Sequence, residues 1–446
     1  MIDSLLVANR GEIARRIIRT ARRLGIRTIA VYSDADEGMP FVIEADEAIC
    51  VGPADPAQSY RNTEAILAAA KATSARAIHP GYGFLSENAD FARQVEANGL
   101  IWVGPSADAI AAMGDKINAR NLMAAAGVPV APGTLEPIDD VDEAVAAVVG
   151  IGYPVMVKAA AGGGGMGMAV ANDEATLRTE FAKVRAFAER MFGDGAVLLE
   201  RYFPRVRHVE VQILGLADGR VIALSERECS VQRRNQKLVE EAPSPAVSAE
   251  LRERFLAAAV KAGEVVGYRN AGTVECLLDP ATGDFFFLEM NTRLQVEHPI
   301  TELIHGIDLV EQQLRIAAGL DVDIPVTTSG HAIELRVNAE DPKRFLPGPG
   351  KVTTWVEPAG DGIRVDSGYS EGTTVGLSYD SLMAKLIILG ADRDDAIAKA
   401  RAAVAGFAIA GPKNNLPFFA ELLENDEFLS GDYDTGIVAR MRATGR

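Results

Sequence analysis

Cysteine is scarce in this chain: Cys50, Cys229 and Cys276 are the three in 446 residues, and none belongs to a CxxC pair. An odd, widely spaced set is typical of a reducing cytoplasm and builds neither a disulfide framework nor a zinc site. Long apolar runs are also missing. The stretch Ala144–Val157 is shorter than the roughly 18 residues of a membrane helix and contains Gly and Pro. The sequence therefore predicts a cytoplasmic protein without a membrane span.

Basic residues are outnumbered by acidic residues. The chain has 45 Lys and Arg against 62 Asp and Glu, a net charge of -17, which argues against nucleic acid or an anionic membrane as a main partner. A G-x-x-x-x-G-K-[ST] motif is absent, so a P-loop NTPase is not expected. The apolar content of 48% and charged content of 24% are ordinary for a globular enzyme. At 446 residues the chain is too long for one core, which predicts two or three domains.

The first ~115 residues have the pattern of an α/β unit with a parallel sheet. Residues 5–8 read as a strand, 11–24 as a helix and 27–32 as a second strand. Residues 9–11, Asn-Arg-Gly, replace the glycine-rich turn that a dinucleotide-binding unit would need, so that interpretation is weak. The arginines of the helix are expected mostly on its exposed face, in solvent or at a subunit contact; they are Arg15, Arg16, Arg19, Arg22 and Arg23.

A glycine-rich segment, residues 159–167 (AAAGGGGMG), lies between predicted strands at 153–158 and 168–171. A Rossmann fingerprint needs a helix directly after its glycines, and here a strand follows. A glycine hairpin beside a lysine suits a lid over nucleotide phosphates, because bare N–H groups approach phosphate oxygens and Lys158 adds a point charge. The alternative is a plain surface hairpin. Four consecutive glycines, each costing about 0.5–1 kcal/mol relative to Ala, favour the lid.

Two glutamates are expected to face each other on a hairpin. Residues 272–279 read as a strand, 280–283 as a turn and 284–291 as the returning strand. Folding about residue 282 pairs 278 with 286, 276 with 288 and so Glu275 with Glu289. Like charges on cross-strand neighbours repel, and a hard divalent cation with oxygen ligands is the expected reason for the pair.

The alternative is a surface hairpin with two solvated acids. The apolar neighbours Leu288 and Met290 argue against it. Beyond the pair, polar and apolar residues alternate as far as residue 297. A straight strand over 289–297 would span about 26 Å, too far for one reaction centre, so a bend is expected near Asn291 and Thr292. The polar, odd positions are expected to share one face; they are Glu289, Asn291, Arg293, Gln295 and Glu297. The apolar, even positions are expected beneath; they are Phe286, Leu288, Met290, Leu294 and Val296.

In the segment 289–297 an arginine suits anion capture and a glutamate suits proton abstraction, whereas a plain amphipathic edge strand would explain only the alternation.

The residues alone leave the role of three other places in the chain undecided. Residues 79–88 follow a strand end, where open α/β sheets bind ligands, but the two glycines there are also ordinary turn chemistry. His208 is by itself more often structural than a ligand. Residues 233–237, with two arginines and a lysine, form a phosphate or carbonate site or a salt-laced loop.

Together these features indicate a nucleotide-dependent ligase, and the chain resembles biotin carboxylase, the ATP-grasp component of biotin-dependent carboxylases, over essentially all 446 residues. The matching motifs are residues 8–14 (ANRGEIA), 79–88 (HPGYGFLSEN), 114–116 (GDK), the glycine-rich segment, 232–243, 289–299 (EMNTRLQVEHP) and 336–342 (RVNAEDP).

The resemblance implies an α/β and α+β multidomain protein with an ATP-grasp fold. Its expected parts are an N-terminal Rossmann-like (pre-ATP-grasp) domain at 1–114, a small glycine-loop lid subdomain at 115–203, a large ATP-grasp subdomain with the metal and bicarbonate site at 204–330, and a C-terminal biotin carboxylase domain at 331–446.

The resemblance also implies roles for single residues. The expected ATP contacts are Lys116, Lys158, Gly162, Gly163, Gly164, Gly165, Glu200, His208 and Gln232. The expected ligands of Mg²⁺ or Mn²⁺ are Glu275, Glu289 and Asn291. Glu297 would deprotonate bicarbonate, which Arg293, Gln295 and the Val296 backbone would position beside Lys237. Arg336 would stabilise the biotin enolate, and Tyr82 would shape the biotin pocket.

The implied reaction passes through carboxyphosphate to carboxybiotin. No Met-Lys-Met attachment sequence is present, so biotin is expected on a separate carboxyl carrier protein or domain, with a carboxyltransferase as second partner and a homodimer as the assembly. The final acceptor (acetyl-CoA, propionyl-CoA, pyruvate or another) stays open.

The chain departs from the family pattern at a few positions. Asn235 stands where many relatives have His, and Met166 and Ala169 where many have Arg, which puts ATP affinity and lid closure in question. The competing interpretations are another ATP-grasp carboxylate–amine ligase and a non-catalytic nucleotide-binding regulatory paralogue.

Overall fold

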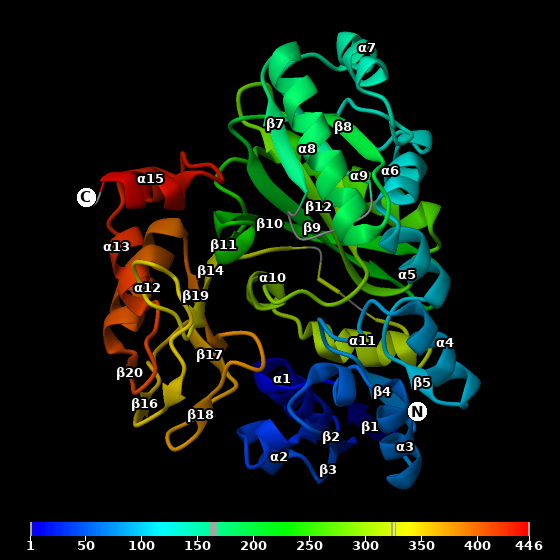
Figure 1. The fold of residues 1–446 in the computed structure, drawn as a ribbon. Helices are drawn as coiled ribbons and strands as arrows, with labels where there is room; N and C mark the ends of the chain where they lie inside the picture. The colour runs from blue at the N-terminus through cyan, green and yellow to red at the C-terminus, as the bar shows by residue number, and fades with distance from the viewer. Residues whose placement is uncertain (1, 161–166, 323, 326, 445–446) are drawn as a thin grey trace.

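The computed structural model describes residues 2–160, 167–322, 324–325 and 327–444. Its N-terminal part lies at the bottom of the view in Figure 1, the C-terminal part at the left, and a smaller unit formed by α7, α8 and β6–β8 at the top. Gly162–Gly165 and Met166 lie outside the described residues. Among the helices of the described part, none is long and apolar enough to cross a membrane.

The N-terminal part is a parallel five-stranded sheet with helices on both faces. Its strands, in spatial order, are β3 (Glu47–Gly52), β2 (Arg27–Ser33), β1 (Ser4–Val7), β4 (Ala77–His79) and β5 (Ile101–Trp102). Its helices are α1 (Gly11–Arg23), α2 (Pro40–Glu44), α3 (Thr63–Ala72), α4 (Ala89–Ala97) and α5 (Ala107–Gly114). Leu5 and Val7 pack in one core with α1, whereas Leu6 packs in another with α3 and α4, as strand alternation requires. The expected parallel α/β unit is confirmed.

The upper unit is a three-stranded antiparallel sheet covered by two helices. Its strands, in spatial order, are β7 (Met168–Ala171), β6 (Val155–Ala159) and β8 (Val197–Arg201). Helix α6 (Lys116–Ala125) leads into it, and its own helices are α7 (Val141–Ile151) and α8 (Glu174–Phe192). The Asp173 side chain caps α8 by accepting a bond from the Thr176 amide. The expected strand–glycine segment–strand–helix order is confirmed.

An eight-stranded antiparallel sheet joins the middle and the C-terminal parts of the chain. Its strands, in spatial order, are β13 (Asp284–Asn291), β12 (Asn270–Asp279), β9 (Arg207–Gly215), β10 (Val221–Arg233), β11 (Gln236–Ala242), β14 (His331–Asn338), β19 (Leu382–Gly390) and β17 (Ile363–Ser367). The domain boundary expected at residue 330 stays a prediction, and it precedes β14 within this continuous sheet. Strands from both sides of that position therefore present side chains to one site.

The remaining elements cover the large sheet or extend the C-terminal part. The helices are α9 (Ala249–Val265), α10 (His298–His305), α11 (Leu309–Ala317), α12 (Arg393–Gly406), α13 (Leu416–Leu422), α14 (Asp426–Ser430) and α15 (Ile437–Thr444). Two small strand pairs are β15 (Gly350–Lys351) with β18 (Thr374–Val375), and β16 (Thr354–Val356) with β20 (Ala408–Ala410).

The β12–β13 hairpin confirms one predicted pairing and corrects the others. Glu275 lies opposite Glu289, but Cys276 pairs with 287 and Leu278 with 285, one position away from the prediction. A bulge at Leu288 accounts for the difference, because the extra residue shifts the register between the two halves of the ladder. Leu288 is consequently 39% exposed, and the expectation that it packs beneath the hairpin was wrong.

The bend expected after Asn291 is confirmed. Strand β13 ends at that residue, and α10 begins at His298. Among the arginines of α1, Arg19, Arg22 and Arg23 are exposed as predicted, but Arg16 is buried. It forms ion pairs with Glu302 in α10 at 2.6 Å and with Asp308, the residue before α11, at 2.8 Å.

Candidate active site

A cavity of about 780 Å³ lies where the N-terminal part, the large sheet and the segment after β13 meet. Ten of the predicted site residues line it: Tyr82, His208, Lys237, Glu275, Glu289, Asn291, Arg293, Gln295, Val296 and Arg336. They come from positions up to 254 residues apart, and the antiparallel order of the strands brings them together. The sequence prediction of one shared site is consistent with this placement.

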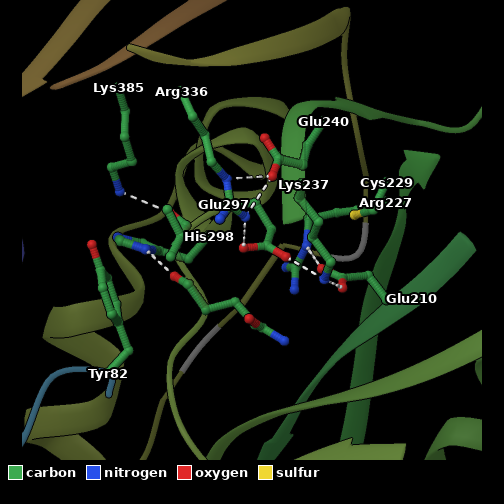
Figure 2. Close-up of polar contacts among 12 residues, drawn as sticks. Tyr82, Glu210, Arg227, Cys229, Lys237, Glu240, Glu297, His298, Arg336 and Lys385 are labelled. Carbon is green, nitrogen blue, oxygen red and sulfur yellow. Dashed lines mark hydrogen bonds and ion pairs between the residues drawn. The ribbon is translucent and has the colours of Figure 1, made fainter. Parts of the chain in front are cut away.

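Glu297 lies at the centre of a buried charge network between Lys237 and Arg336 (Figure 2). Its Oε1 is 2.7 Å from Lys237 Nζ and its Oε2 is 2.9 Å from an Arg336 guanidinium nitrogen. Glu297 is fully buried and is the residue before α10, so its backbone is fixed by the start of that helix. A carboxylate held between two cations stays ionised and is available to accept a proton.

The electrostatics agree with this geometry. Burial would raise the pKa of Glu297, but Lys237 and Arg336 outweigh it and hold that pKa well below its ordinary value. Burial raises the pKa of the neighbouring Glu240 to about 7, although Arg336 donates to it at 2.6 Å. The pKa of Glu297 is therefore lowered and that of Glu240 is raised, although both carboxylates contact Arg336. This difference is the pattern that separates a proton acceptor from a group that keeps its proton.

Lys237 contacts two further carboxylates, Glu210 at 2.5 Å and Glu275 at 2.8 Å. Burial would lower the pKa of Lys237, but these carboxylates and Glu297 raise it well above its ordinary value. The lysine is thus a fixed positive charge in this arrangement and cannot serve as a base. It ties the Glu275 side of the site to the Glu297 side.

Glu210 and Arg227 were missed as site residues by sequence reasoning. They form a fully buried ion pair at 2.5 Å beneath Lys237, and the Arg227 guanidinium also donates to Thr273 and Thr301 at 3.0 Å each. Glu210 follows His208 by two positions in β9, so the same-face alternation of a strand was an available signal. Arg227 gave no comparable signal, because its partners come from β9, β12 and α10.

Glu275, one of the predicted metal ligands, is surrounded by polar side chains. Its Oε1 accepts bonds from Asn291 Nδ2 at 2.9 Å and Gln295 Nε2 at 3.1 Å, and its Oε2 is 3.0 Å from His208 Nε2. Glu289, opposite in the ladder, has a side chain that is 41% exposed and lies 3.8 Å from Lys116. Burial and then the Glu275 charge raise the pKa of Glu289.

This donor set fits a hard divalent cation. Two facing carboxylates and a carboxamide oxygen are ligands that Mg²⁺ and Mn²⁺ accept, and a cation would relieve the repulsion between the carboxylates. The Asn291 oxygen presently accepts from Arg293 at 2.8 Å and would exchange that bond for the metal. Within the described residues, another group with ligand atoms in mutual reach is His208, Glu210 and Glu275. It shares only Glu275 with the prediction.

Arg293 is held by a residue that the sequence did not single out for this purpose. Its Nε donates to Glu87 at 2.9 Å, and the Thr292 amide donates to the same carboxylate at 3.2 Å. A second bond from Arg293 reaches Gln295 Oε1 at 3.0 Å. Glu87 belongs to the segment 79–88, which therefore contributes to the site through contact with the arginine rather than through turn geometry alone.

The predicted ATP contacts are distributed over several places. Lys158 in β6 forms an ion pair with Glu200 in β8, and Lys116 faces Glu289 at 3.8 Å. Gln232 donates to the Cys229 carbonyl of its own strand at 3.4 Å and does not line the cavity. Gly162–Gly165 lie outside the described residues, so the phosphate-lid role stays a prediction.

The basic segment 233–237 divides between two tasks. Lys237 lines the cavity, whereas Arg233 donates to the Phe345 carbonyl at 3.1 Å and stacks on that ring at 4.7 Å. Arg234 and Asn235 form the β10–β11 turn with φ of 50° and 65°. Asn tolerates this left-handed conformation, which accounts for its compatibility with the turn at the position where many relatives have His.

Comparison with known proteins agrees with the fold and the site. The sequence profile described as biotin carboxylase, N-terminal domain, matches residues 1–110, carbamoyl-phosphate synthase L chain, ATP binding domain, matches 115–324, and biotin carboxylase C-terminal domain matches 334–440. Biotin carboxylase 1 of Bacillus subtilis is 49% identical over 439 residues, which cover 98% of each protein. The chain belongs to the biotin carboxylase family.

Other relatives are equally similar over their length. Biotin carboxylase of Haemophilus influenzae is 48% identical over 97% of both chains, and biotin carboxylase of Pseudomonas aeruginosa is 48% identical over 97% of this chain and 96% of the relative. The expected ATP-grasp biotin carboxylase fold and the assignment to ATP-dependent ligases are thereby confirmed.

Solved structures show the same architecture. The biotin carboxylase–beta-gamma-ATP complex from Campylobacter jejuni superposes with a TM-score of 0.94 at 43% identity and covers 99% of each chain. The biotin carboxylase domain dimer of Hydrogenobacter thermophilus 2-oxoglutarate carboxylase, solved with MgADP, ADP and bicarbonate, gives a TM-score of 0.92 at 43% identity, covering 99% of this chain and 98% of that one.

Proposed function

We propose that this family member carboxylates the N1′ atom of biotin with bicarbonate and ATP, through carboxyphosphate. The observation that carries the proposal is Glu297, a buried carboxylate kept ionised between Lys237 and Arg336. Both of these cations line the cavity, as do Arg293 and Gln295. A base beside an anion-binding arginine suits bicarbonate, whose oxygen must lose a proton as it attacks phosphorus.

In the proposed sequence, Glu297 accepts the bicarbonate proton while a bicarbonate oxygen attacks the γ-phosphorus and the bond to ADP breaks. Carboxyphosphate then separates into CO₂ and phosphate, phosphate removes the N1′ proton of biotin, and the enolate attacks CO₂. Arg336 faces the cavity and would stabilise the enolate oxygen, while Tyr82 would shape the pocket for the ureido ring. Phosphoryl transfer itself depends on positioning and charge neutralisation.

Mg²⁺ or Mn²⁺, bound by Glu275, Glu289 and Asn291, would supply charge neutralisation at the phosphates. Lys116, Lys158, Glu200, His208 and Gln232 would hold ATP, with Gly162–Gly165 over its phosphates. This assignment rests on the positions of the family motifs in the sequence. In this structure Lys158 and Glu200 pair with each other and do not line the cavity.

The partners follow from the proposed half-reaction. Biotin is expected on a separate carboxyl carrier protein or domain, with a carboxyltransferase to complete the cycle, in a cytoplasmic homodimer. The domain limits 1–114, 115–203, 204–330 and 331–446 are part of the same proposal. The structural relatives include a domain dimer, which supports a dimeric assembly.

The test measures ADP release from the purified protein with Mg²⁺ and ATP, with and without bicarbonate and with free biotin added. The proposal expects release that requires bicarbonate and rises with biotin. Glu297→Gln should lower it by about 10²–10⁴, the usual contribution of a placed general base. Glu250→Gln, at an exposed position of α9, is the matched control. ATP binding without bicarbonate-dependent turnover would contradict the proposal and favour a regulatory paralogue.

A further inference from the structure

Two cations occupy directly paired positions on neighbouring strands of the large sheet. Arg336 in β14 is the register partner of Lys385 in β19, so both side chains leave the same face of the sheet. Arg336 reaches the Glu297 carboxylate at 2.9 Å, and Lys385 Nζ donates to the backbone carbonyl of Val296 at 2.7 Å. The two cations therefore hold consecutive residues of one turn (Figure 2).

Lys385 is fully buried in an otherwise apolar strand, Leu-Met-Ala-Lys-Leu-Ile-Ile-Leu. Burying an ammonium is costly unless it is paired and hydrogen-bonded. Its partners are the Val296 carbonyl and the buried carboxylate of Glu12 in α1, 3.4 Å away. Glu12 in turn accepts a hydrogen bond from the Tyr82 hydroxyl. The Lys385 ammonium thus connects the turn that contains Val296 and Glu297 with Tyr82, the tyrosine of the proposed biotin pocket.

The preceding peptide plane of the turn is fixed as well. Nδ1 of the buried His298 lies 2.8 Å from the Gln295 carbonyl oxygen, which can only accept, so this nitrogen carries the proton. The Gln295 carbonyl shares its peptide plane with the Val296 N–H, and the Val296 carbonyl shares the next plane with the Glu297 N–H. His298 and Lys385 therefore orient two successive planes, one on each side of Val296.

We propose that Lys385 is a positioning residue for the reaction: by holding the Val296 carbonyl it sets the orientation of the turn that presents the Val296 N–H and the Glu297 carboxylate to bicarbonate. The inference rests on the proposed function of Glu297. Displacement of a reacting group by about 1 Å can cost about 10²-fold in rate, so loss of this single hydrogen bond is expected to be measurable.

The test replaces the ammonium with an apolar chain of similar length, Lys385→Met, and compares it with Lys413→Met, an exposed lysine of the same part of the chain. Bicarbonate-dependent ADP release is measured over bicarbonate concentration, together with ATP binding in the absence of bicarbonate. The expected result is a rise of about tenfold or more in the bicarbonate KM and a similar fall in kcat, with ATP affinity unchanged. Purely structural damage would lower ATP affinity and the amount of active enzyme and leave the bicarbonate KM alone.

The outcomes separate the two proposals. A wild-type protein without bicarbonate-dependent ADP release overturns the proposed function itself. An active wild type, together with a Lys385→Met variant whose bicarbonate KM and kcat are both within twofold of it, overturns the role of Lys385. If Lys385→Met does not fold, Lys385→Gln, which retains a neutral donor on a shorter chain, is measured in the same way. A bicarbonate KM and a kcat both within twofold of the wild type would then overturn the role of Lys385.

Discussion

Glu275 and Glu289 lie directly opposite each other across the β12–β13 ladder, yet their surroundings differ. Glu275 is buried, and its carboxylate contacts the side chains of Lys237, His208, Asn291 and Gln295. The Glu289 side chain is 41% exposed and lies 3.8 Å from Lys116. One carboxylate is therefore anchored by the protein, and the other is available to an incoming cation.

This asymmetry predicts the effect of Glu289→Gln on metal binding. The variant should weaken Mn²⁺ binding in the presence of ADP by at least the roughly 10–100-fold that loss of an outer-shell partner costs, since a charged ligand is lost while the anchored Glu275 remains. Mn²⁺ binding followed by electron paramagnetic resonance measures the change. Glu371→Gln, at an exposed position, should bind as the wild type does. Equal affinity in the wild type and Glu289→Gln would show that Glu289 is not a ligand.

The hairpin also shows how far the sequence leads. Strand limits, the turn and the 275–289 pairing follow from local patterns, because alternation and turn residues are local properties. The bulge at Leu288 was not predictable in the same way. It depends on Phe285 and Phe287 packing into the core, where they are 3% and 6% exposed, in place of Phe286.

Contacts between distant segments were the harder part. Lys385 meets Glu12 across 373 positions, and Arg16 meets Glu302 across 286, so their burial follows from the packing of α1 against other parts of the chain. A lone lysine inside an apolar strand was a usable signal, because burying it requires a partner. No pattern within α1 separates the buried Arg16 from the exposed Arg19.

Lys237→Gln is predicted to alter the pH dependence of the reaction. Lys237 is a main cause of the low pKa of Glu297, and its removal leaves Glu210, Glu275 and Glu297 without their shared cation. The pKa of Glu297 should rise, and because a base works only when deprotonated, the acid limb of the rate profile should move to higher pH. The profile of bicarbonate-dependent ADP release checks this. A variant with a lower rate and an unmoved acid limb would contradict it.

Arg16→Met is predicted to destabilise the protein, although Arg16 lies outside the reaction site. Removing one partner of a buried ion pair typically costs about 3–5 kcal/mol. The cost is expected at the low end of that range, because Glu302 keeps Arg364 at 2.8 Å and Asp308 keeps Arg23 at 2.8 Å. Denaturant unfolding followed by fluorescence measures the change. The matched control is Arg93→Met, whose ion pairs with Asp90 and Asp108 are exposed and should contribute nothing measurable. Equal shifts in the two variants would contradict the prediction.

Glu241 is predicted to contribute to the stability of the C-terminal part in a pH-dependent way. It accepts from Arg393 at 2.7 Å, lies 2.6 Å from His331 Nε2 and also receives the Tyr433 hydroxyl. Burial would raise the pKa of Glu241, but His331 and Arg393 lower it from the ordinary 4.5 to about 2. A carboxyl whose pKa is lower in the folded state stabilises that state fully above pH 4.5, and the contribution is lost as the pH falls towards 2.

Glu241→Gln should therefore unfold more easily than the wild type at pH 7, by about 3 kcal/mol for a shift of this size. Because the wild-type carboxyl loses this advantage as it becomes protonated, the difference between the two unfolding free energies should shrink as the pH falls from 4.5 towards 2. Urea unfolding of both proteins across that range measures it. The exposed Glu371→Gln should follow the wild-type curve throughout. A difference that is independent of pH would show that Glu241 acts through packing alone, since a carboxylate stabilised by His331 and Arg393 loses that advantage on protonation.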